Sequence, residues 1–328
     1  MFENLGVTIA WQASTIEGLD AIASEADKLG FGYFWVPEAW GLEGFSTVSH
    51  VFGKTSRIRV GTGITNIFSR SAALIGMGCA TLDQMAPGRF VLGLGSSGKS
   101  LVENWHGFEF SKPLKRTREY VQVIRKVVSG ENVEFHGDIL KPLSKFRLFT
   151  KAMQSKLEIY LGAIGNANLR LAGEICDGAI LAMYPSSRLD STLKLLNVNG
   201  GTEKKLFTYL PTFVSTSEEE LKKARQQVAK NIAFYVTSMG SYYVRNLIRS
   251  GYEDAVSEIL RGYAHGSRTV VESVSEEMLS DLSLIGSPES IMERVSTFPN
   301  GVVPVMAFDI RSLKEAINSM RVLSTRSR

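Results

Sequence analysis

Residues 56–95, SRIRVGTGITNIFSRSAALIGMGCATLDQMAPGRFVLGLG, contain the repeating pattern that decides the fold. A short apolar strand pattern at residues 57–61 is followed by an amphipathic helix pattern at residues 72–85. Pro87 and Gly88 end that helix, and a second apolar strand pattern follows at residues 90–94. Two strands joined by a helix of this length predict neighbouring parallel strands with a right-handed crossover.

The same alternation of strand and helix extends in both directions along the chain. At the amino-terminal end, Ser14 and Glu17 have the spacing of a helix-capping pair, and Gly30 stands where that helix should end. Eight strand candidates fit a closed (β/α)₈ barrel, the TIM-barrel fold, better than an open doubly wound sheet. The eight candidates are residues 5–10, 33–36, 57–61, 90–94, 157–161, 179–182, 206–214 and 302–308.

Two stretches interrupt the alternation. Residues 131–150 are polar and poor in strand patterns, and we expect an excursion over the mouth of the barrel there. Residues 217–284 are almost wholly helical in pattern, which is too long for one barrel helix. We therefore expect one barrel domain over residues 1–328, with a helical insertion at 217–284 near the active-site end.

Composition excludes several classes of protein. The 328 residues include 37 basic and 33 acidic side chains, a small and scattered excess that gives no case for nucleic-acid binding. No apolar run is long enough to span a membrane, and residues 1–6 do not form a secretion signal, so we expect a cytoplasmic protein. Cys79 and Cys176 lie in apolar helical patterns and are expected to be buried thiols, and no cluster has the spacing of metal ligands.

One motif points to a different function. Residues 93–100, GLGSSGKS, match the phosphate-binding P-loop pattern and follow an apolar strand. A P-loop requires a sustained helix directly after its Lys-Ser pair, whereas His106, Gly107 and Pro113 interrupt any helix here. We therefore disfavour a nucleotide hydrolase, although a P-loop nucleotide-binding protein remains an alternative.

Six segments in order resemble the bacterial-luciferase-like superfamily of flavin and coenzyme F420 enzymes, and most of all its methylenetetrahydromethanopterin-reductase-like branch. The resemblance spans nearly the whole chain. It implies a (β/α)₈ barrel with a cofactor at the carboxyl ends of the strands. The segments are LGFGYFWVPE (29–38), SRIRVGTGITN (56–66), GRFVLGLG (88–95), IYLGA (159–163), LAGEICDG (171–178) and IGSPE (285–289).

The resemblance also implies roles for particular residues. Gly63 and Ile64 match a bulge with a non-prolyl cis peptide that backs the cofactor ring, and Thr65 and Asn66 would meet the ring edge. The plain alternative is an ordinary turn at the end of a strand.

Two further segments would hold the rest of the cofactor. Gly95, Ser96, Ser97 and Gly98 match the loop that lines the cofactor side chain. The segment after the fifth strand precedes a helix amino terminus, a ready site for the cofactor phosphate. Its residues are Gly162, Ala163, Gly165 and Asn166.

Glu38 ends the second strand and is the candidate catalytic carboxylate, with a solvated loop residue as the alternative. The chain departs from the family in two places. Deazaflavin enzymes often have aspartate–histidine where this chain has Glu38 and Ala39. The reductases carry a glutamate on strand one where Thr8 stands, which argues against the reaction on a C1 carrier.

The sequence therefore predicts an oxidoreductase that transfers a hydride between coenzyme F420 and a small organic substrate. Alternatives are an FMN-dependent luciferase-like monooxygenase and a barrel that carries a flavin without catalysis. Trp35, Trp40 and Trp105 could wall an aromatic pocket or pack in the core. Members of the family commonly form dimers, so a homodimer or higher homo-oligomer is expected.

Overall fold

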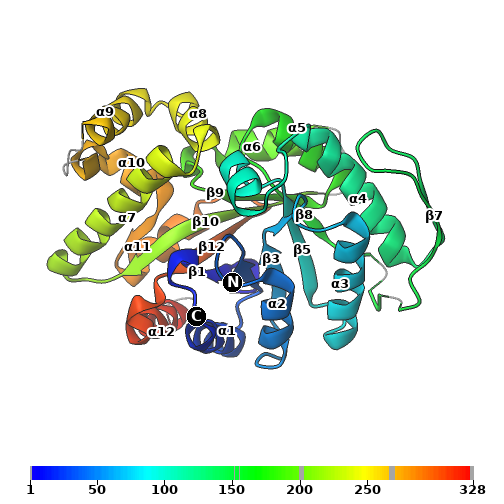
Figure 1. The fold of residues 1–328 in the computed structure, drawn as a ribbon. Coiled ribbons are helices and arrows are strands. Elements are labelled where there is room, and N and C mark those ends of the chain that lie inside the picture. The colour runs from blue at the N-terminus through cyan, green and yellow to red at the C-terminus, as the bar shows by residue number, and fades with distance from the viewer. Residues whose placement is uncertain (1, 151, 155, 199–202, 266–269, 326–328) are drawn as a thin grey trace.

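Eight parallel strands form a closed ring in the computed structural model, which describes residues 2–150, 152–154, 156–198, 203–265 and 270–325 (Figure 1). The ring closes where β9 pairs with β10, so the predicted barrel is confirmed. In ring order the strands are β10 (Lys205–Val214), β12 (Val302–Phe308), β1 (Gly6–Ile9), β2 (Tyr33–Pro37), β3 (Arg59–Gly63), β5 (Phe90–Gly95), β8 (Ile159–Gly162) and β9 (Gly178–Ala182).

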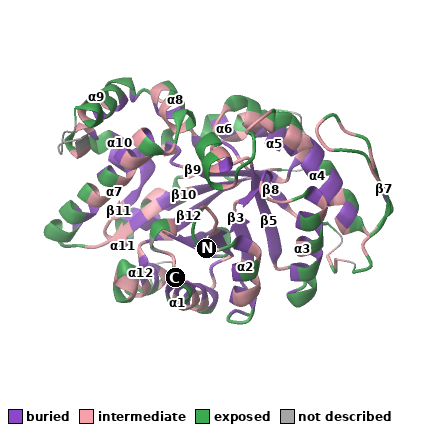
Figure 2. Ribbon diagram, in the orientation of Figure 1, coloured by how far each residue is buried: buried purple, intermediate pink, exposed green. Residues whose placement is uncertain are grey.

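Helices cover the outside of this ring, with their buried faces toward the strands (Figure 2). Two short strands extend the sheet at the carboxyl end of the ring: β4 (Thr65–Asn66) pairs with β5, and β11 (Leu284–Gly286) pairs with β10. No described helix is long and apolar enough to cross a membrane. The covering helices are α1 (Ile16–Leu29), α2 (Gly44–Phe52), α3 (Ala72–Met85), α4 (Pro113–Ser129), α5 (Asn166–Ile175), α6 (Leu189–Leu196), α11 (Pro288–Ser296) and α12 (Leu313–Thr325).

Local contacts explain where elements begin. The cap of α1 is Thr15, whose side chain accepts from the Gly18 amide, so the predicted cap at Ser14 is one residue early. Gly30 ends that helix in the left-handed conformation, as predicted. The third strand begins at Arg59, two residues later than predicted, because the Asp27 carboxylate accepts from the amides of residues 56–58 and holds them off the ladder.

Large aromatic side chains fill the half of the barrel nearest the amino ends of its strands. Trp35, Tyr160 and Tyr33 pack against Phe207 with ring centroids 4.8 Å apart. At the amino end, the Tyr33 hydroxyl accepts from Arg59 Nη1 at 3.1 Å, and Lys205 Nζ donates to it at 2.7 Å. This end is therefore filled by side chains, and a ligand is expected at the opposite end.

Residues 131–150 do not cover the mouth of the barrel, so that prediction is wrong. They contain an antiparallel hairpin of β6 (Val133–Phe135) and β7 (Leu143–Phe146), which lies outside α4 (Figure 1). The buried Glu119 carboxylate of α4 accepts from the backbone amides of residues 138–140. The hairpin follows α4, which runs from the mouth to the opposite end of the barrel. Beyond the hairpin, Gln154 donates to the Phe90 carbonyl at the amino end of β5, so this part of the chain is at the end away from the mouth.

Residues 217–284 form four α-helices within the described part of the chain: α7 (Glu218–Ser238), α8 (Ser241–Arg249), α9 (Glu253–Ala264) and α10 (Glu276–Leu282). They share a small apolar core that includes Ile232, Leu247 and Ile259. Met183, which follows β9, and Phe213, near the end of β10, pack into the same cluster. This helical segment therefore sits at the carboxyl ends of β9 and β10, beside the open end of the barrel (Figure 1).

Candidate functional site at the mouth of the barrel

Small residues surround the open end of the barrel. Side chains alternate along a strand, so the residue two positions after an inward side chain also faces inward. The inward residues Val91, Tyr160, Ile180 and Val305 belong to one interior cluster. Further along the same strands, the inward positions nearest the mouth have almost no side chain, which leaves space there for a flat ligand. These positions are Gly95, Gly162, Ala182 and Ala307.

Ile64 forms part of the floor of this space. The peptide bond between Gly63 and Ile64 is cis, as the resemblance implied, and it joins β3 to β4. A Cβ atom built at Gly95 would collide with Ile64 Cδ1, and one at Gly162 would lie 3.3 Å from it. Glycine at both positions thus makes room for the Ile64 side chain. The structure therefore brings three of the predicted cofactor-binding segments together.

Tyr209 completes the floor, and the sequence analysis did not single it out. Its side chain starts on β10 and crosses the barrel, since a Cβ atom at Gly63 on the opposite strand would collide with the Tyr209 hydroxyl. That hydroxyl is buried and has no hydrogen-bond partner among the described residues. Burial raises the pKa of Tyr209 well above its usual value, so the phenol stays protonated. The alternation of Phe207 and Tyr209 along the strand was the signal that could have found it.

Two more polar atoms near the floor lack partners. Thr65 Oγ1 and Asn66 Nδ2 are buried without a hydrogen bond among the described residues, while Asn66 Oδ1 accepts from the Phe68 amide at 2.8 Å. A buried polar group without a partner costs about 1–3 kcal/mol. Asn66 pairs with the inward Gly95, whereas Thr65 pairs with Leu94, which packs in the outer core, so only the Asn66 amide faces the mouth. Together with Tyr209, this amide suits a planar ring that carries hydrogen-bonding groups at its edge. The residues therefore fit a flavin or deazaflavin ring.

The two predicted loops differ in what they offer to a ligand. Ser96, Ser97 and Gly98 are partly exposed beyond β5, with Ser97 in the left-handed conformation at φ 58°. At the next loop, Gly165 precedes α5 and Asn166 is its exposed first residue, with no side chain capping the helix. Those amides are suited to an anion. The amide of Ala163 is not, because it already donates to the Ile180 carbonyl.

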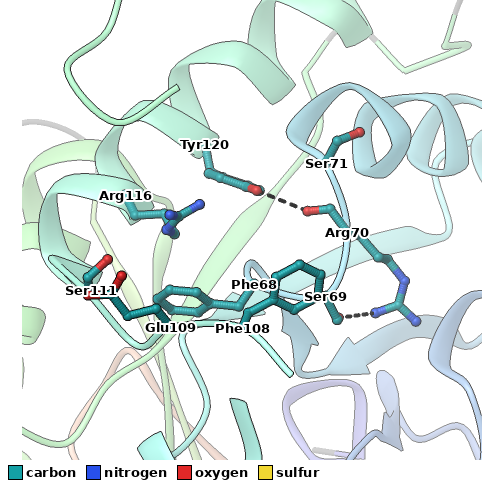
Figure 3. Close-up of a pocket in the computed structure, with 9 residues that line it drawn as sticks. All are labelled: Phe68, Ser69, Arg70, Ser71, Phe108, Glu109, Ser111, Arg116 and Tyr120. Carbon is teal, nitrogen blue, oxygen red and sulfur yellow. Dashed lines mark hydrogen bonds between the residues drawn. The ribbon is translucent and has the colours of Figure 1, made fainter. Parts of the chain in front are cut away.

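A cavity of about 380 Å³ opens beside the mouth, between the amino ends of α3 and α4 (Figure 3). None of the residues predicted to bind cofactor lines it. Phe68 lies two residues beyond Asn66, so the cavity begins close to the predicted ring edge. Arg116 lies over the Phe68 ring, 4.7 Å from its centroid. The lining residues are Phe68, Ser69, Arg70, Ser71, Phe108, Glu109, Ser111, Arg116 and Tyr120.

Comparison of the sequence with family models identifies the family of this chain. Residues 5–303 match the sequence model of the family described as luciferase-like monooxygenase. The chain belongs to the luciferase-like monooxygenase family. It is 30% identical to 5,10-methylenetetrahydromethanopterin reductase of Archaeoglobus fulgidus over 86% of each chain.

Two solved structures have the same fold as this luciferase-like chain. A coenzyme F420-dependent tetrahydromethanopterin reductase from Methanopyrus kandleri superposes with a TM-score of 0.83 at 20% identity and covers 99% of both chains. An F420-dependent secondary alcohol dehydrogenase, solved with an F420–acetone adduct, gives 0.76 at 19% identity and covers 97% of both chains. At these identities the two likenesses show the fold alone.

Glu38 of this luciferase-like chain is held in an ion pair, and its side chain is only 9% exposed. Arg70 Nη1 donates to Glu38 Oε1 at 2.6 Å, and Arg70 Nη2 donates to Oε2 at 3.1 Å. The Gly44 amide, at the start of α2, also donates to Oε2 at 2.7 Å. The carboxylate is therefore not a solvated loop residue, since donors from Arg70 and the Gly44 amide contact both of its oxygens.

The P-loop alternative disagrees with the structure of the luciferase-like barrel. Gly93 and Gly95 lie within β5, and a Cβ atom at Gly93 would collide with the Thr62 carbonyl of the neighbouring strand. These glycines are therefore explained by packing of the barrel. The segment after Ser100 is a five-residue π-helix, Leu101–Trp105, and Lys99 is 67% exposed. A P-loop needs a long helix at that point, so the match to its pattern is fortuitous.

The tryptophans have different environments in the luciferase-like structure. Trp35 is fully buried inside the barrel, and Trp105 is 65% exposed. Trp40 packs against Trp11, which follows β1, with ring centroids 4.3 Å apart. The Trp11 indole lies beside the Tyr235 hydroxyl of α7. The helical segment is thereby joined to the rim of the mouth through Trp11, a residue that the sequence analysis missed.

Proposed function

We propose that this chain is an oxidoreductase that moves a hydride between bound coenzyme F420 and a small organic substrate. The observation that carries the proposal is the pair of buried polar groups of Asn66 and Tyr209, unpartnered among the described residues, beside the Gly63–Ile64 peptide. A curated relative from Mycobacterium tuberculosis, 26% identical over 93% of this chain, is named a putative coenzyme F420-dependent oxidoreductase, which supports F420 over FMN.

Bound F420 would supply the ring carbon that accepts or donates the hydride, so the hydride itself needs no protein side chain, and the proton that the substrate releases or takes up would be exchanged with solvent water at the open mouth. Gly63 and Ile64 would back the ring, and Asn66 would bind its edge, whereas Thr65, whose side chain faces the outer core, would not contact it. The loop of Gly95, Ser96, Ser97 and Gly98 would line the side chain of the cofactor. Gly162, Gly165 and Asn166 would face its phosphate at the amino end of α5. Ala163 would contribute packing only, because its amide is occupied.

The substrate would enter below the helical segment, whose α7 contacts the rim through Tyr235 and Trp11. We do not extend the C1-carrier reaction of the reductases to this chain. Thr8 occupies the position of their strand-one glutamate, and its hydroxyl donates to the Trp35 carbonyl at 2.8 Å. We propose that Glu38 fixes Arg70 and the start of α2 and does not exchange protons with the substrate.

Parallel titration of purified protein with F420 and FMN, followed by cofactor fluorescence, tests the proposal. We expect F420 to bind at least about 10-fold tighter than FMN, which corresponds to about 1.4 kcal/mol. Reduction of bound F420 by a panel of secondary alcohols and other hydride donors would then show turnover. Tighter binding of FMN would favour a monooxygenase, and F420 binding without any turnover would favour a cofactor carrier. Binding of neither cofactor would contradict the proposal.

We also propose that the chain forms a homodimer through α3. Leu74, Met77 and Met85 lie on one face of this helix and are each about half exposed. Apolar patches that stay exposed on a monomer commonly mark protein interfaces. Light scattering should give about twice the chain mass of 36.1 kDa for the wild type. The double variant Leu74→Glu/Met77→Glu should have the mass of one chain, and a monomeric wild type would contradict the proposal.

A further inference from the structure

We infer that the cavity between the amino ends of α3 and α4 binds an oxyanion, a phosphate or a carboxylate group, through Arg116. The ligand that fits this position is the anionic side chain of a cofactor whose ring lies in the mouth. In naming that ligand, the inference rests on the proposed function.

Arg116 is a half-buried cation without an acidic partner. Within the described ranges no carboxylate lies within ion-pair distance of its guanidinium, and its buried Nε has no hydrogen-bond partner. The guanidinium lies over Phe68 and near Tyr120, with ring centroids 4.7 and 6.0 Å away. Stacking on a ring face stabilises a guanidinium and leaves its edge free to donate, which is the geometry that recognises phosphate and carboxylate.

The amino end of α4 adds to the positive potential. Arg116 is in the first turn of this helix. Lys112, the residue that precedes the helix, provides no side-chain cap. Pro113 has no N–H and the Arg116 amide donates to the Lys112 carbonyl, so the amides of Leu114 and Lys115 are the first-turn donors that favour a negative group nearby. Ser111 lines the cavity beside them. Figure 3 shows the Arg116 guanidinium in the space below Tyr120, facing the cavity.

The other charged groups that line the cavity do not supply a partner for Arg116. Arg70 is already bound to Glu38 and Glu43, so its charge is matched. Glu109 is exposed to solvent, where water screens its carboxylate, and it forms no ion pair with Arg116. The unmatched charge inside the cavity is therefore that of Arg116.

The cavity is also within reach of the mouth. Phe68 forms one wall of the cavity, and its amide donates to Asn66 Oδ1 at the predicted ring edge. A ligand whose ring lies on Ile64 and whose side chain passes Asn66 can thus bring an anionic group to Arg116. This arrangement would favour a cofactor with several anionic groups in its side chain.

The test compares the whole wild-type chain with Arg116→Met, Arg116→Lys and a matched control, Arg118→Met. Arg118 is on the same helix but is paired with Glu174 and does not line the cavity. Fluorescence titration uses F420 with its glutamate tail, F420 with the tail removed, FMN and riboflavin. We expect Arg116→Met to weaken binding of full-length F420 by about 10- to 100-fold, the usual effect of one charge-assisted hydrogen bond. Arg116→Lys should retain part of the affinity, and Arg118→Met should change it by less than about twofold.

The ligands distinguish the two anionic groups. If Arg116 binds the tail carboxylates, removing the tail should abolish the effect of Arg116→Met. If it binds the phosphate, in place of the amino end of α5, the effect should persist without the tail and appear for FMN but not for riboflavin. Equal affinities of wild type and Arg116→Met for all four ligands would overturn the inference and leave the proposed function intact.

A second measurement separates failure of this inference from failure of the proposed function. Inorganic phosphate and glutarate are added to the protein without cofactor, and thermal unfolding is followed. Stabilisation of the wild type and Arg118→Met, but not of Arg116→Met, would support the anion site even if neither F420 nor FMN bound. Equal stabilisation of all variants, or of none, in a protein that binds neither cofactor would overturn the anion site together with the proposed function.

Discussion

Gly63→Val is expected to abolish binding of F420 and FMN while the barrel remains folded. A Cβ atom at position 63 would collide with the Tyr209 hydroxyl and lie 3.3 Å from Cζ of the same ring. Tyr209 packs beside Trp35, with ring centroids 6.4 Å apart, so it cannot move without disturbing the interior cluster. The bulge must then move outward, and the ring would lose the surface that backs it.

The stability cost of this substitution should be moderate. Overpacking an interior usually costs about 1–3 kcal/mol, whereas domains are stable by about 5–15 kcal/mol. Cofactor titration and thermal unfolding of the same sample measure the two effects separately. Gly41→Ala is the matched control, since the nearest atom to its new Cβ would be 3.8 Å away.

A double variant tests the contact itself. Gly63→Ala alone should destabilise the protein, and Tyr209→Phe should relieve part of that loss because it removes the colliding oxygen. Additive effects of the two changes would show that the residues do not meet. Unchanged cofactor affinity in Gly63→Val would count against the proposed position of the ring.

Glu38→Gln is expected to reduce the free energy of unfolding by about 3 kcal/mol, because it leaves the half-buried Arg70 without its main counter-charge. Glu38 and Arg70 side chains are 9% and 16% exposed, so water compensates little for the loss. Urea denaturation of the wild type and the variant measures this change. Glu43→Gln is the matched control: Glu43 contacts the same arginine but is 46% exposed, and we expect less than about 1 kcal/mol.

The same variant decides between two roles for Glu38. If the carboxylate only positions Arg70, Arg70→Gln should cause a similar loss, and the double variant should lose little more than either single variant. If Glu38 exchanges protons with the substrate, turnover should fall by about 100-fold or more while the unfolding free energy stays unchanged. The second result would restore Glu38 as the catalytic residue predicted from the sequence.

Much of the fold follows from local sequence patterns. The predicted limits of α3 (Ala72–Met85) and β12 (Val302–Phe308) agree with the structure, because periodicity and end signals are local. Ser14 and residues 57–61 were predicted less well, by one or two residues. In both places a nearby group, Thr15 or Asp27, satisfies the backbone in a way that propensity does not report.

The path of residues 131–150 was wrong for a related reason. Their polar composition correctly indicated that they lie outside the regular alternation, but composition does not say at which end of the barrel a segment lies. That is decided by α4, which carries the chain away from the mouth, and by Glu119, whose carboxylate holds the hairpin against the helix.

By itself, the sequence predicted the eight-strand barrel and, through the resemblance, the Gly63–Ile64 cis peptide, and the structure confirms both. The position of the cofactor site, which the resemblance also implied, stays a prediction. Only the tertiary structure showed that Glu38 is bound by Arg70, that Tyr209 crosses the barrel to Gly63, and that Arg116 faces a cavity and has no acidic partner among the described residues. Strands and helices depend on the spacing of side chains along the chain. The first two contacts join residues that are 32 and 146 positions apart in the sequence. The groups that surround Arg116 also come from separate segments, and these segments meet only when the barrel closes.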